Sequence, residues 1–389
     1  MNRRRLGALA VVLGSILPAA APLAAQSVAR DSKNGSEDRS ADRVEIRSGY
    51  FYHGLPFGSD AYLGPIDVLL NKGFNMSQAA NRDRRIFGAA YGARHVRGAV
   101  FDPFGSVERS GGWGTFLREQ ILPIQAWAWI RSGFDWGAAD NMTWYPNYFG
   151  HLIEGGISSR RLAEKLRAQG VPYARLFAGA TTMAAAVINE MYTHPTLEHG
   201  TGATVADLYI FDLGGVLLFS SDAVARFFSE KLHASVWSSQ ASLTLPSGEL
   251  ANNANNLVFK LPIPFVERAS FFVRTAVGSH VGATLHLDGY DLSLGVGADT
   301  HRQNIDPISG HETVDIRPSA SLYLDRQGSL LASLYWSQVD HRLLTLNVYP
   351  GVLHDSFGAW VLVTRDEGVQ LGISSRSALG LGIGADVGR

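Results

Sequence analysis

The chain has 389 residues, of which 46% are apolar, and a formal charge of −1 at pH 7. This length allows one large hydrophobic core or two ordinary ones. A nearly neutral chain without a long basic run is not expected to bind nucleic acid, because such binding needs a basic surface that neutralises phosphates. The absence of cysteine rules out disulfides, thiolate metal sites and a cysteine nucleophile.

The first 25 residues have the pattern of a secretory signal peptide. Three arginines (3–5) precede an apolar stretch (6–17), and small residues then lead to a cleavage point near Ala25. The apolar stretch is too short for a stable membrane span, and an uncleaved anchor is the alternative. An exported protein without disulfides depends on its own core or on a membrane, so we expect the outer membrane or periplasm of a Gram-negative bacterium.

Residues 26–42 are polar, charged and free of aromatic side chains, which predicts a disordered leader. Residues 43–232 are predicted to form an irregular opening segment followed by a helical unit. Within the opening segment, residues 86–100 suggest one or two strands with glycine kinks. The aromatic stretch 115–136 predicts a helix interrupted at Pro123.

Three helices are expected between residues 144 and 219, and each carries a polar residue where a core residue would be expected. The first places Tyr148, His151 and Leu152 on one face. The third is predicted to begin at Thr204, because Thr204 to Asp207 matches a capping box with Asp as its acidic member. It would run through Phe219, with Leu232 as its furthest end.

The second of these helices carries an apolar stripe that Glu190 continues at the same spacing. The stripe consists of Leu176, Ala180, Met183 and Val187. It faces either protein or lipid. A carboxylate at its end favours protein, since a buried charge needs a partner.

Beyond residue 232 the pattern changes to short alternating segments separated by turns that contain Asp and Gly. The expected strands are 239–245, 257–261, 270–277, 280–287, 290–300, 313–324, 329–337, 342–349, 359–365, 369–374 and 378–387. Tandem hairpins predict an antiparallel meander over residues 233–389, and closure into a barrel of roughly 8–12 strands would remove its exposed edges. The expected fold class is therefore α+β.

The last expected strand alternates between large apolar residues and glycine. Leu381 and Ile383 face one way, and Gly380 and Gly382 face the other; residues 290–298 repeat the pattern. Such strands fit a membrane barrel with a lipid-facing exterior and an interior crowded by something bulky, such as a helix. The alternative is a soluble barrel or sandwich whose apolar face is core.

The candidate site consists of His151, Glu190 and Asp207, one from each expected helix, with Asp212 close by in sequence. A histidine with carboxylates could act as a general acid/base group or bind a metal ion. Each residue also has a structural interpretation, because Asp207 could cap a helix, His151 could bond a neighbouring helix and Glu190 could satisfy backbone near a helix end. No cofactor is expected, and the sequence identifies no metal.

One further pattern concerns the order of these residues. Asn147-Tyr148-Phe149-Gly150-His151 is followed by Glu190, then Thr204-x-x-Asp207 and Gly214-Gly215. This order resembles an uncharacterised domain-of-unknown-function family of bacterial envelope proteins and is loosely similar to VanZ-like membrane proteins. Leu152 departs from the family pattern, which has proline after the histidine. The resemblance implies an envelope location and a helix–barrel unit, with no reaction attached.

The expected function is an outer-membrane β-barrel with a structural, channel or lipid-handling role, in contact with membrane lipid. One alternative is an envelope lipid-modifying hydrolase that uses His151, Glu190 and Asp207. The other is a soluble periplasmic barrel that binds a small lipophilic ligand. Between a non-enzymatic protein and an enzyme, the sequence favours the non-enzymatic protein.

Overall fold

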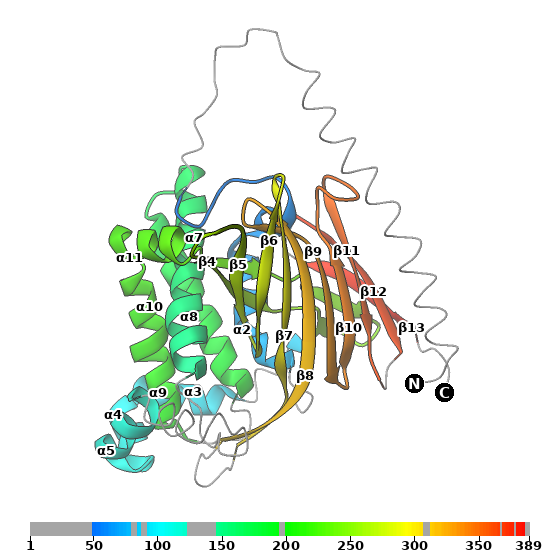
Figure 1. The fold of residues 1–389 in the computed structure, drawn as a ribbon. Helices are drawn as coiled ribbons and strands as arrows, with labels where there is room; N and C mark the ends of the chain where they lie inside the picture. Colours follow the sequence, from blue (N-terminus) through cyan, green and yellow to red (C-terminus); the bar gives the residue numbers. More distant parts are fainter. Residues whose placement is uncertain are drawn as a thin grey trace.

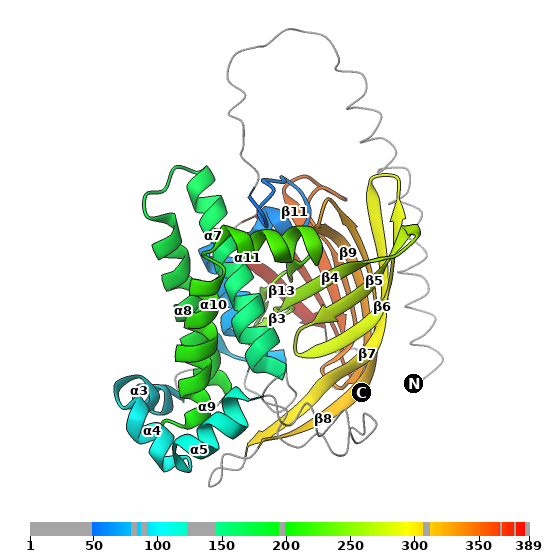
Figure 2. The same cartoon turned by 60° about the vertical axis from the view of Figure 1, so that its left-hand side comes forward.

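The computed structural model describes residues 49–78, 84–86, 92–122, 145–193, 199–305, 312–365, 368–376 and 379–385. The expected signal peptide and leader lie outside the described residues, as does the stretch around Pro123. Helices come first along the chain and stand beside a large, strongly curved sheet (Figures 1 and 2). The α+β class is confirmed.

The helical elements include several π-helical stretches, each directly next to an α-helix. In chain order they are η1 (Gly58–Tyr62), α2 (Pro65–Gly73), η2 (Asn75–Gln78), α3 (Ala93–Phe101), α4 (Pro103–Arg109), α5 (Gly112–Phe116), η4 (Leu117–Ile121), η6 (Pro146–Glu154), α7 (Gly155–Ala168), α8 (Ala174–Thr193), α9 (Gly202–Val205), η7 (Ala206–Asp212), α10 (Leu213–Leu218), α11 (Asp222–Arg226) and η8 (Phe227–Lys231). Here η1 and η2 are 3₁₀ helices, and the other η elements are π-helices.

The three helices expected between residues 144 and 219 are present as η6 with α7, as α8, and as α9 with η7 and α10. The expected helix start at Thr204 is wrong. The cap is Thr201, whose hydroxyl accepts a hydrogen bond from the Thr204 N–H, so Asp207 lies inside the helix and is buried. The third helix ends at Leu218, and the chain bends by 82° before continuing into α11 and η8.

The expected strand structure in the second half of residues 86–100 is also wrong, because Ala93–Phe101 forms α3, while residues 87–91 lie outside the described residues. Val96 and Ala99 of this helix are buried against other helices, and Gly98 closely approaches the backbone of Gly200. The glycine thus serves a close helix contact instead of kinking a strand.

The apolar stripe expected on α8 lies partly on the wrong face. Leu176 is 72% exposed and Ala180 is exposed, whereas Ala178, Ala186 and Glu190 are buried. Small residues allow α8 to approach its neighbours closely, and the large apolar side chains are left on the outside.

Every strand expected from the sequence has a counterpart, and β1 and β3 are additional. The strands are β1 (Ser235–Ser238), β2 (Ser242–Leu245), β3 (Glu249–Ala251), β4 (Asn255–Ile263), β5 (Val266–Thr275), β6 (Gly278–Leu287), β7 (Tyr290–Ile305), β8 (Glu312–Arg326), β9 (Ser329–Val339), β10 (Arg342–Val348), β11 (Phe357–Val363), β12 (Val369–Ser375) and β13 (Gly380–Ala385). From β4 to β13 each strand pairs antiparallel with the next, which confirms the meander.

The ends of this meander are extended by a segment that precedes it in the chain. β1 pairs antiparallel with β4, whereas β2 pairs in parallel with β13 and antiparallel with β3. The sheet therefore has thirteen strands and is mixed, instead of purely antiparallel with 8–12 strands as expected. Only residues 239–241 separate β1 from β2, and Gln240 among them donates from Nε2 to the Val348 carbonyl oxygen across the sheet interior.

The helices cover the part of the sheet that contains β1 to β4. Phe51, Ile157 and Phe219 pack there with Val236 and Leu257 in one buried cluster. A second cluster joins α2 and α8 to residues around β2 and β3. The helical elements thus lie against the first strands and leave the outer face of the remaining strands without helical cover (Figure 2).

Buried charges on α7 hold the N-terminal segment in place. Arg161 forms an ion pair of 2.6 Å with Asp60 and donates to the Val236 carbonyl oxygen. Glu164 accepts hydrogen bonds from successive backbone N–H groups, including that of Phe51 at 2.9 Å. Arg161 and Glu164, which belong to a strongly charged part of the sequence, therefore link the segment around η1 to the sheet.

Candidate functional site

The three sequence-predicted site residues converge inside the helical unit. His151, Glu190 and Asp207 are all buried, and one potential ligand atom from each lies within 4.8 Å of the others. They come from η6, α8 and η7 respectively. The interpretation of Asp207 as a cap is excluded by its position within the helix.

Asp212 orients the ring of His151. The His151 Nδ1–H donates to the Asp212 carboxylate at 2.8 Å, which leaves Nε2 directed towards Asp207 at 4.0 Å. His151, Asp207 and Asp212 lie on π-helical stretches, whose wider turns shift side-chain directions and where functional residues are often found. The π-helical turn places Asp207 and Asp212 on the same buried side of one helix.

Glycine residues set the distance between the helices that carry this group. A Cβ at Gly215 would lie 2.4 Å from the Leu152 carbonyl oxygen, and one at Gly156 would lie 2.3 Å from the Phe219 ring. A Cβ at Gly155 would lie 3.0 Å from Lys72 Nζ. The two Gly-Gly pairs therefore allow the backbone contact that brings His151 and Asp212 together.

Lys72 of α2 adds a positive charge to this centre. Its ammonium group lies 3.0 Å from Asp212 and 3.8 Å from Glu154. Glu154 in turn accepts hydrogen bonds from Ser158 and, across to β4, from Asn255. The polar centre thus connects α2, η6 and η7 to the sheet.

On the other side, Glu190 is connected to His95 of α3 through Thr204. His95 Nδ1–H donates to the His199 carbonyl oxygen, and burial lowers the pKa of His95, so its Nε2 is an acceptor. His95 Nε2 accepts a hydrogen bond from the Thr204 hydroxyl, with 2.6 Å between Nε2 and Oγ1. Thr204 is also hydrogen-bonded to Glu190, and because its own proton is donated to His95 it accepts from the Glu190 carboxyl when that group is protonated.

The protonation states follow from the same neighbours. Burial raises the pKa of Glu190 well above its ordinary value, and the charge of Asp207 adds to this effect. Burial by itself lowers the pKa of His151, but Asp212 and Asp207 outweigh it and raise the value to about 9. Burial opposes ionisation of Asp212, yet Lys72 and His151 lower its pKa. At neutral pH the centre therefore holds a charged His151, and burial favours the protonated form of Glu190.

This arrangement can hold or transfer protons along a buried chain of hydrogen bonds. His151, Glu190 and Asp207 could also hold a divalent cation, with Asp212 fixing the histidine ring in the way that outer carboxylates orient metal-binding histidines. The same contacts serve equally well to lock the helices together, because each charge has a partner.

Sequence reasoning missed Lys72, Glu154 and His95. Glu154 follows His151 by three residues, so the helical period could have placed it on the same side. Lys72 follows Pro65 within an apolar run, and proline at the first position of a helix was the available signal. His95 had no signal, because its segment was interpreted as strands.

Comparison with protein-family models, with curated proteins and with solved structures finds no match to the chain. The resemblance to an envelope family therefore stays a hypothesis that rests on the residues quoted for it.

Proposed function

We propose that the chain is a cell-envelope protein, exported by its signal peptide and inserted in a membrane through the outer face of its sheet. The observation that carries this proposal is an inversion of polarity in the sheet, with large apolar side chains exposed and ionisable side chains buried. The role that follows is structural, channel-forming or lipid-handling, in contact with membrane lipid.

The exposed face of β5 to β13 is almost continuously apolar. Its large side chains, which are 38–62% exposed, include Phe271, Val281, Leu285, Leu294, Val296, Leu322, Trp336, Leu371, Ile373, Leu381 and Ile383. Proteins that stay in water rarely expose a contiguous apolar surface of this extent. Lipid is the environment in which such a face is stable.

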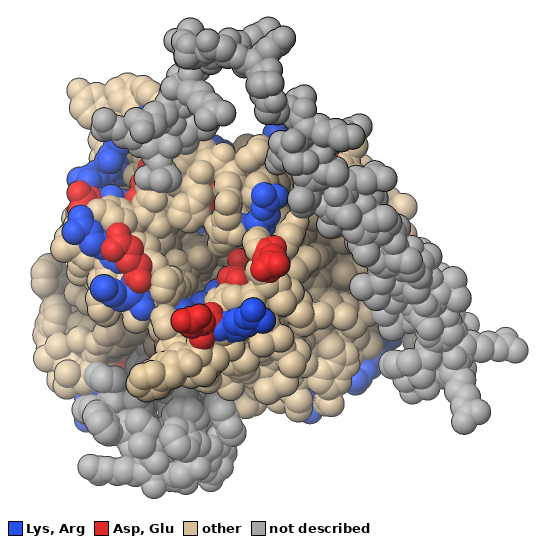
Figure 3. All heavy atoms as spheres, turned by 45° about the horizontal axis from the view of Figure 1, so that its top comes forward, with Lys and Arg blue, Asp and Glu red and all other residues tan. Residues whose placement is uncertain are grey.

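The opposite face of the same strands is polar and buried. It carries the ion pairs of Lys260 with Asp325 and of Arg274 with Asp299, together with serines and threonines. Figure 3 shows charged side chains gathered around a hollow at one end of the molecule, with uncharged atoms over most of the rest of that view. A polar interior with charged ends and apolar flanks supports a membrane barrel over a soluble one.

We infer that the sheet closes into a barrel, with its two edge strands β1 and β3 at the seam. The supporting contacts run between strands that are far apart in the sheet order. Trp237 of β1 donates to the Gly328 carbonyl oxygen beyond β8, and Tyr62 bonds Ser374 of β12 while packing in the same cluster as Trp237. The space inside the glycine-bearing strands is taken by Trp360, which lies against Gly372 and Gly382, instead of the helix expected there.

Among the described residues, no single helix is both long and apolar enough to cross a membrane. One pair, Gly202–Leu218 with Asp222–Lys231, meets the criteria together although it is sharply bent.

The test is cell fractionation with a carbonate wash, followed by gel electrophoresis with and without boiling. Retention in the outer membrane and a heat-dependent shift in mobility are expected. Recovery in the soluble periplasm would contradict the proposal and would favour a soluble barrel with a bound ligand.

A second candidate is a lipid-modifying hydrolase that uses His151, Glu190 and Asp207. The favouring observation is the His151–Asp212 hydrogen bond, which leaves the protonated Nε2 of the charged His151 beside Asp207, where it can act as a general acid. A His151→Gln variant separates the two candidates. Intact folding with altered envelope lipid composition would support chemistry, whereas joint loss of folding and abundance would support a structural centre.

A further inference from the structure

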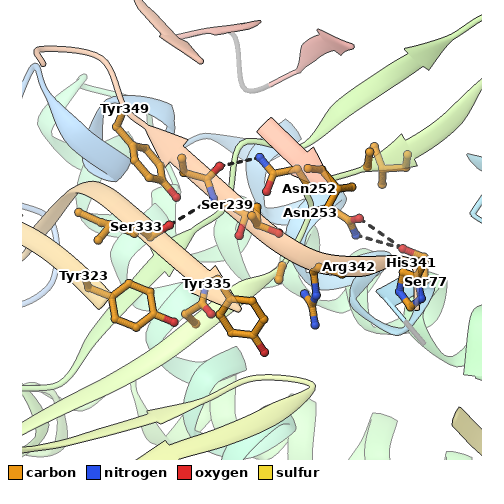
Figure 4. A pocket seen from close by; sticks show the side chains of 18 of the residues that line it. Ser77, Ser239, Asn252, Asn253, Tyr323, Ser333, Tyr335, His341, Arg342 and Tyr349 are labelled. Atoms are coloured by element: carbon orange, nitrogen blue, oxygen red, sulfur yellow. Dashed lines mark hydrogen bonds between the residues drawn. The ribbon is translucent and has the colours of Figure 1, made fainter. Parts of the chain in front are cut away.

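A polar pocket lies within the sheet, away from the helical site. Its lining includes Arg274 of β5, Tyr335 of β9, Arg342 and Thr345 of β10, and Asn252. Figure 4 shows Tyr335 and Arg342 side by side in this pocket, with Asn252 and Asn253 near them. Tyr335 and Thr345 are directly paired across neighbouring strands, so their side chains share one face.

The pocket has an excess of positive charge. Among the described residues that line it there are three arginines and no Asp or Glu. Arg84 is paired with Glu249 at 3.1 Å. Arg274 and Arg342 both lie near the carboxylate of the fully buried Asp299, at 3.6 and 3.8 Å.

The two guanidinium groups are held close to one another by aromatic packing. Arg274 and Arg342 both lie over the ring of Tyr335, at 5.2 and 5.0 Å from its centroid. Burial lowers the pKa of His280, which stacks on the same ring, to about 2, and the two arginines add to this effect. A neutral histidine in this position fits a positive local potential.

Several donors in the pocket have no hydrogen-bond partner among the described residues. They are Arg274 Nη1, the Tyr335 hydroxyl and the Thr345 hydroxyl, and each side chain is more than nine-tenths buried. Buried donors are almost always satisfied in folded proteins, by protein, water or ligand. Of the three unsatisfied donors, one belongs to a guanidinium group and two are hydroxyls beside it, a set that suits an acceptor with negative charge.

We propose that this pocket binds an oxyanion, a carboxylate or phosphate group, between Arg274, Arg342, Tyr335 and Thr345. The bound group accepts hydrogen bonds from the two hydroxyls and from Arg274 Nη1, the donors that have no partner among the described residues. The site needs no contribution from His151, Glu190 or Asp207 and does not depend on which membrane surrounds the protein.

The test uses the purified full-length chain, with inorganic phosphate and acetate as probes in calorimetric titrations. At least one probe is expected to bind, and Arg342→Gln is expected to weaken it by about tenfold or more, since a charge-assisted hydrogen bond is lost. The matched control is Arg317→Gln, because Arg317 is exposed, lies outside the pocket and is paired with Asp315. It is expected to bind like the wild type.

Two milder variants keep the proposal testable if Arg342→Gln does not fold. Tyr335→Phe and Thr345→Val each remove a hydroxyl that bonds no other described residue, so the ligand-free protein keeps its thermal stability while affinity falls about threefold to tenfold. Absence of binding by both probes at tens of millimolar, or equal affinity in all variants, would overturn the proposal.

The source of the anion is distinguished in a separate arm. A short-chain phosphatidic acid is compared with inorganic phosphate on the wild type and on Arg342→Gln. Tighter binding of the lipid, lost in the variant, assigns a lipid headgroup, and equal affinity assigns a free anion. Binding of the lipid that Arg342→Gln leaves unchanged would place the lipid elsewhere and count against the site.

Discussion

At the scale of single residues, the helical centre is a set of charges that depend on one another. Asp212 is fully buried and lies between His151 and Lys72. Buried ion pairs add little stability compared with apolar residues, but removal of one partner leaves the other charge without compensation. The centre is therefore expected to be sensitive to any single substitution.

We expect Asp212→Asn to lower the free energy of unfolding by about 3–5 kcal/mol, because two buried cations lose their shared partner. Urea unfolding of the purified protein measures the change. The matched control is Asp222→Asn, since Asp222 also pairs with an arginine but is 61% exposed, and the change there should be much smaller. Equal losses in both variants would contradict the role given to Asp212.

The pH dependence of stability follows from the same centre. The folded-state pKa of His151, about 9, lies above its unfolded value of 6.5, so its contribution is complete below pH 6.5 and is lost as pH rises through 9. The pKa of Glu190 is also raised in the folded state, so its contribution to the free energy of unfolding also falls as pH rises. We expect the free energy of unfolding to fall by roughly 1–3 kcal/mol between pH 6.5 and 9.5. Urea unfolding at both pH values measures it, and a slope unchanged in His151→Gln would exclude His151 as the cause.

At the scale of elements, glycine decides how closely the helices approach. Gly215→Ala would drive a Cβ against the Leu152 carbonyl oxygen, and backbone cannot move aside easily. We expect a loss of about 1–3 kcal/mol, as for other overpacked interiors. Thermal unfolding measures it.

Gly150→Ala is the matched control, because Gly150 is also helical and a Cβ there would meet nothing within 4 Å. Alanine has the better helix propensity, so this variant should gain about 0.5–1 kcal/mol. A loss in Gly150→Ala similar to that in Gly215→Ala would mean that helix propensity, not packing, controls the stability of these elements.

At the scale of the whole molecule, the question is which solvent the outer face meets. Leu294 is 57% exposed on β7. In water, Leu294→Arg would change stability by no more than about 0.5 kcal/mol, whereas in lipid it would cost about 2–4 kcal/mol. We expect the larger loss in urea unfolding from lipid vesicles. Asp288→Arg, in the exposed turn between β6 and β7, is the control and should be nearly neutral.

The sequence by itself predicted the α+β class, the three central helices and the strands of the meander, because each depends on a local period or turn. It also selected His151, Glu190 and Asp207 by residue type. These predictions required no knowledge of distant contacts.

Only the tertiary structure decided how these parts meet. Lys72 and His95 owe their roles to Asp212 and Thr204, which lie more than a hundred residues away in the chain. The helical form of residues 93–101 and the inward face of α8 likewise depend on packing against other elements. The pairing of β13 with β2 and the convergence of Arg274 and Arg342 on Asp299 are likewise non-local. A period fixes which residues share a face, but packing alone fixes what that face touches.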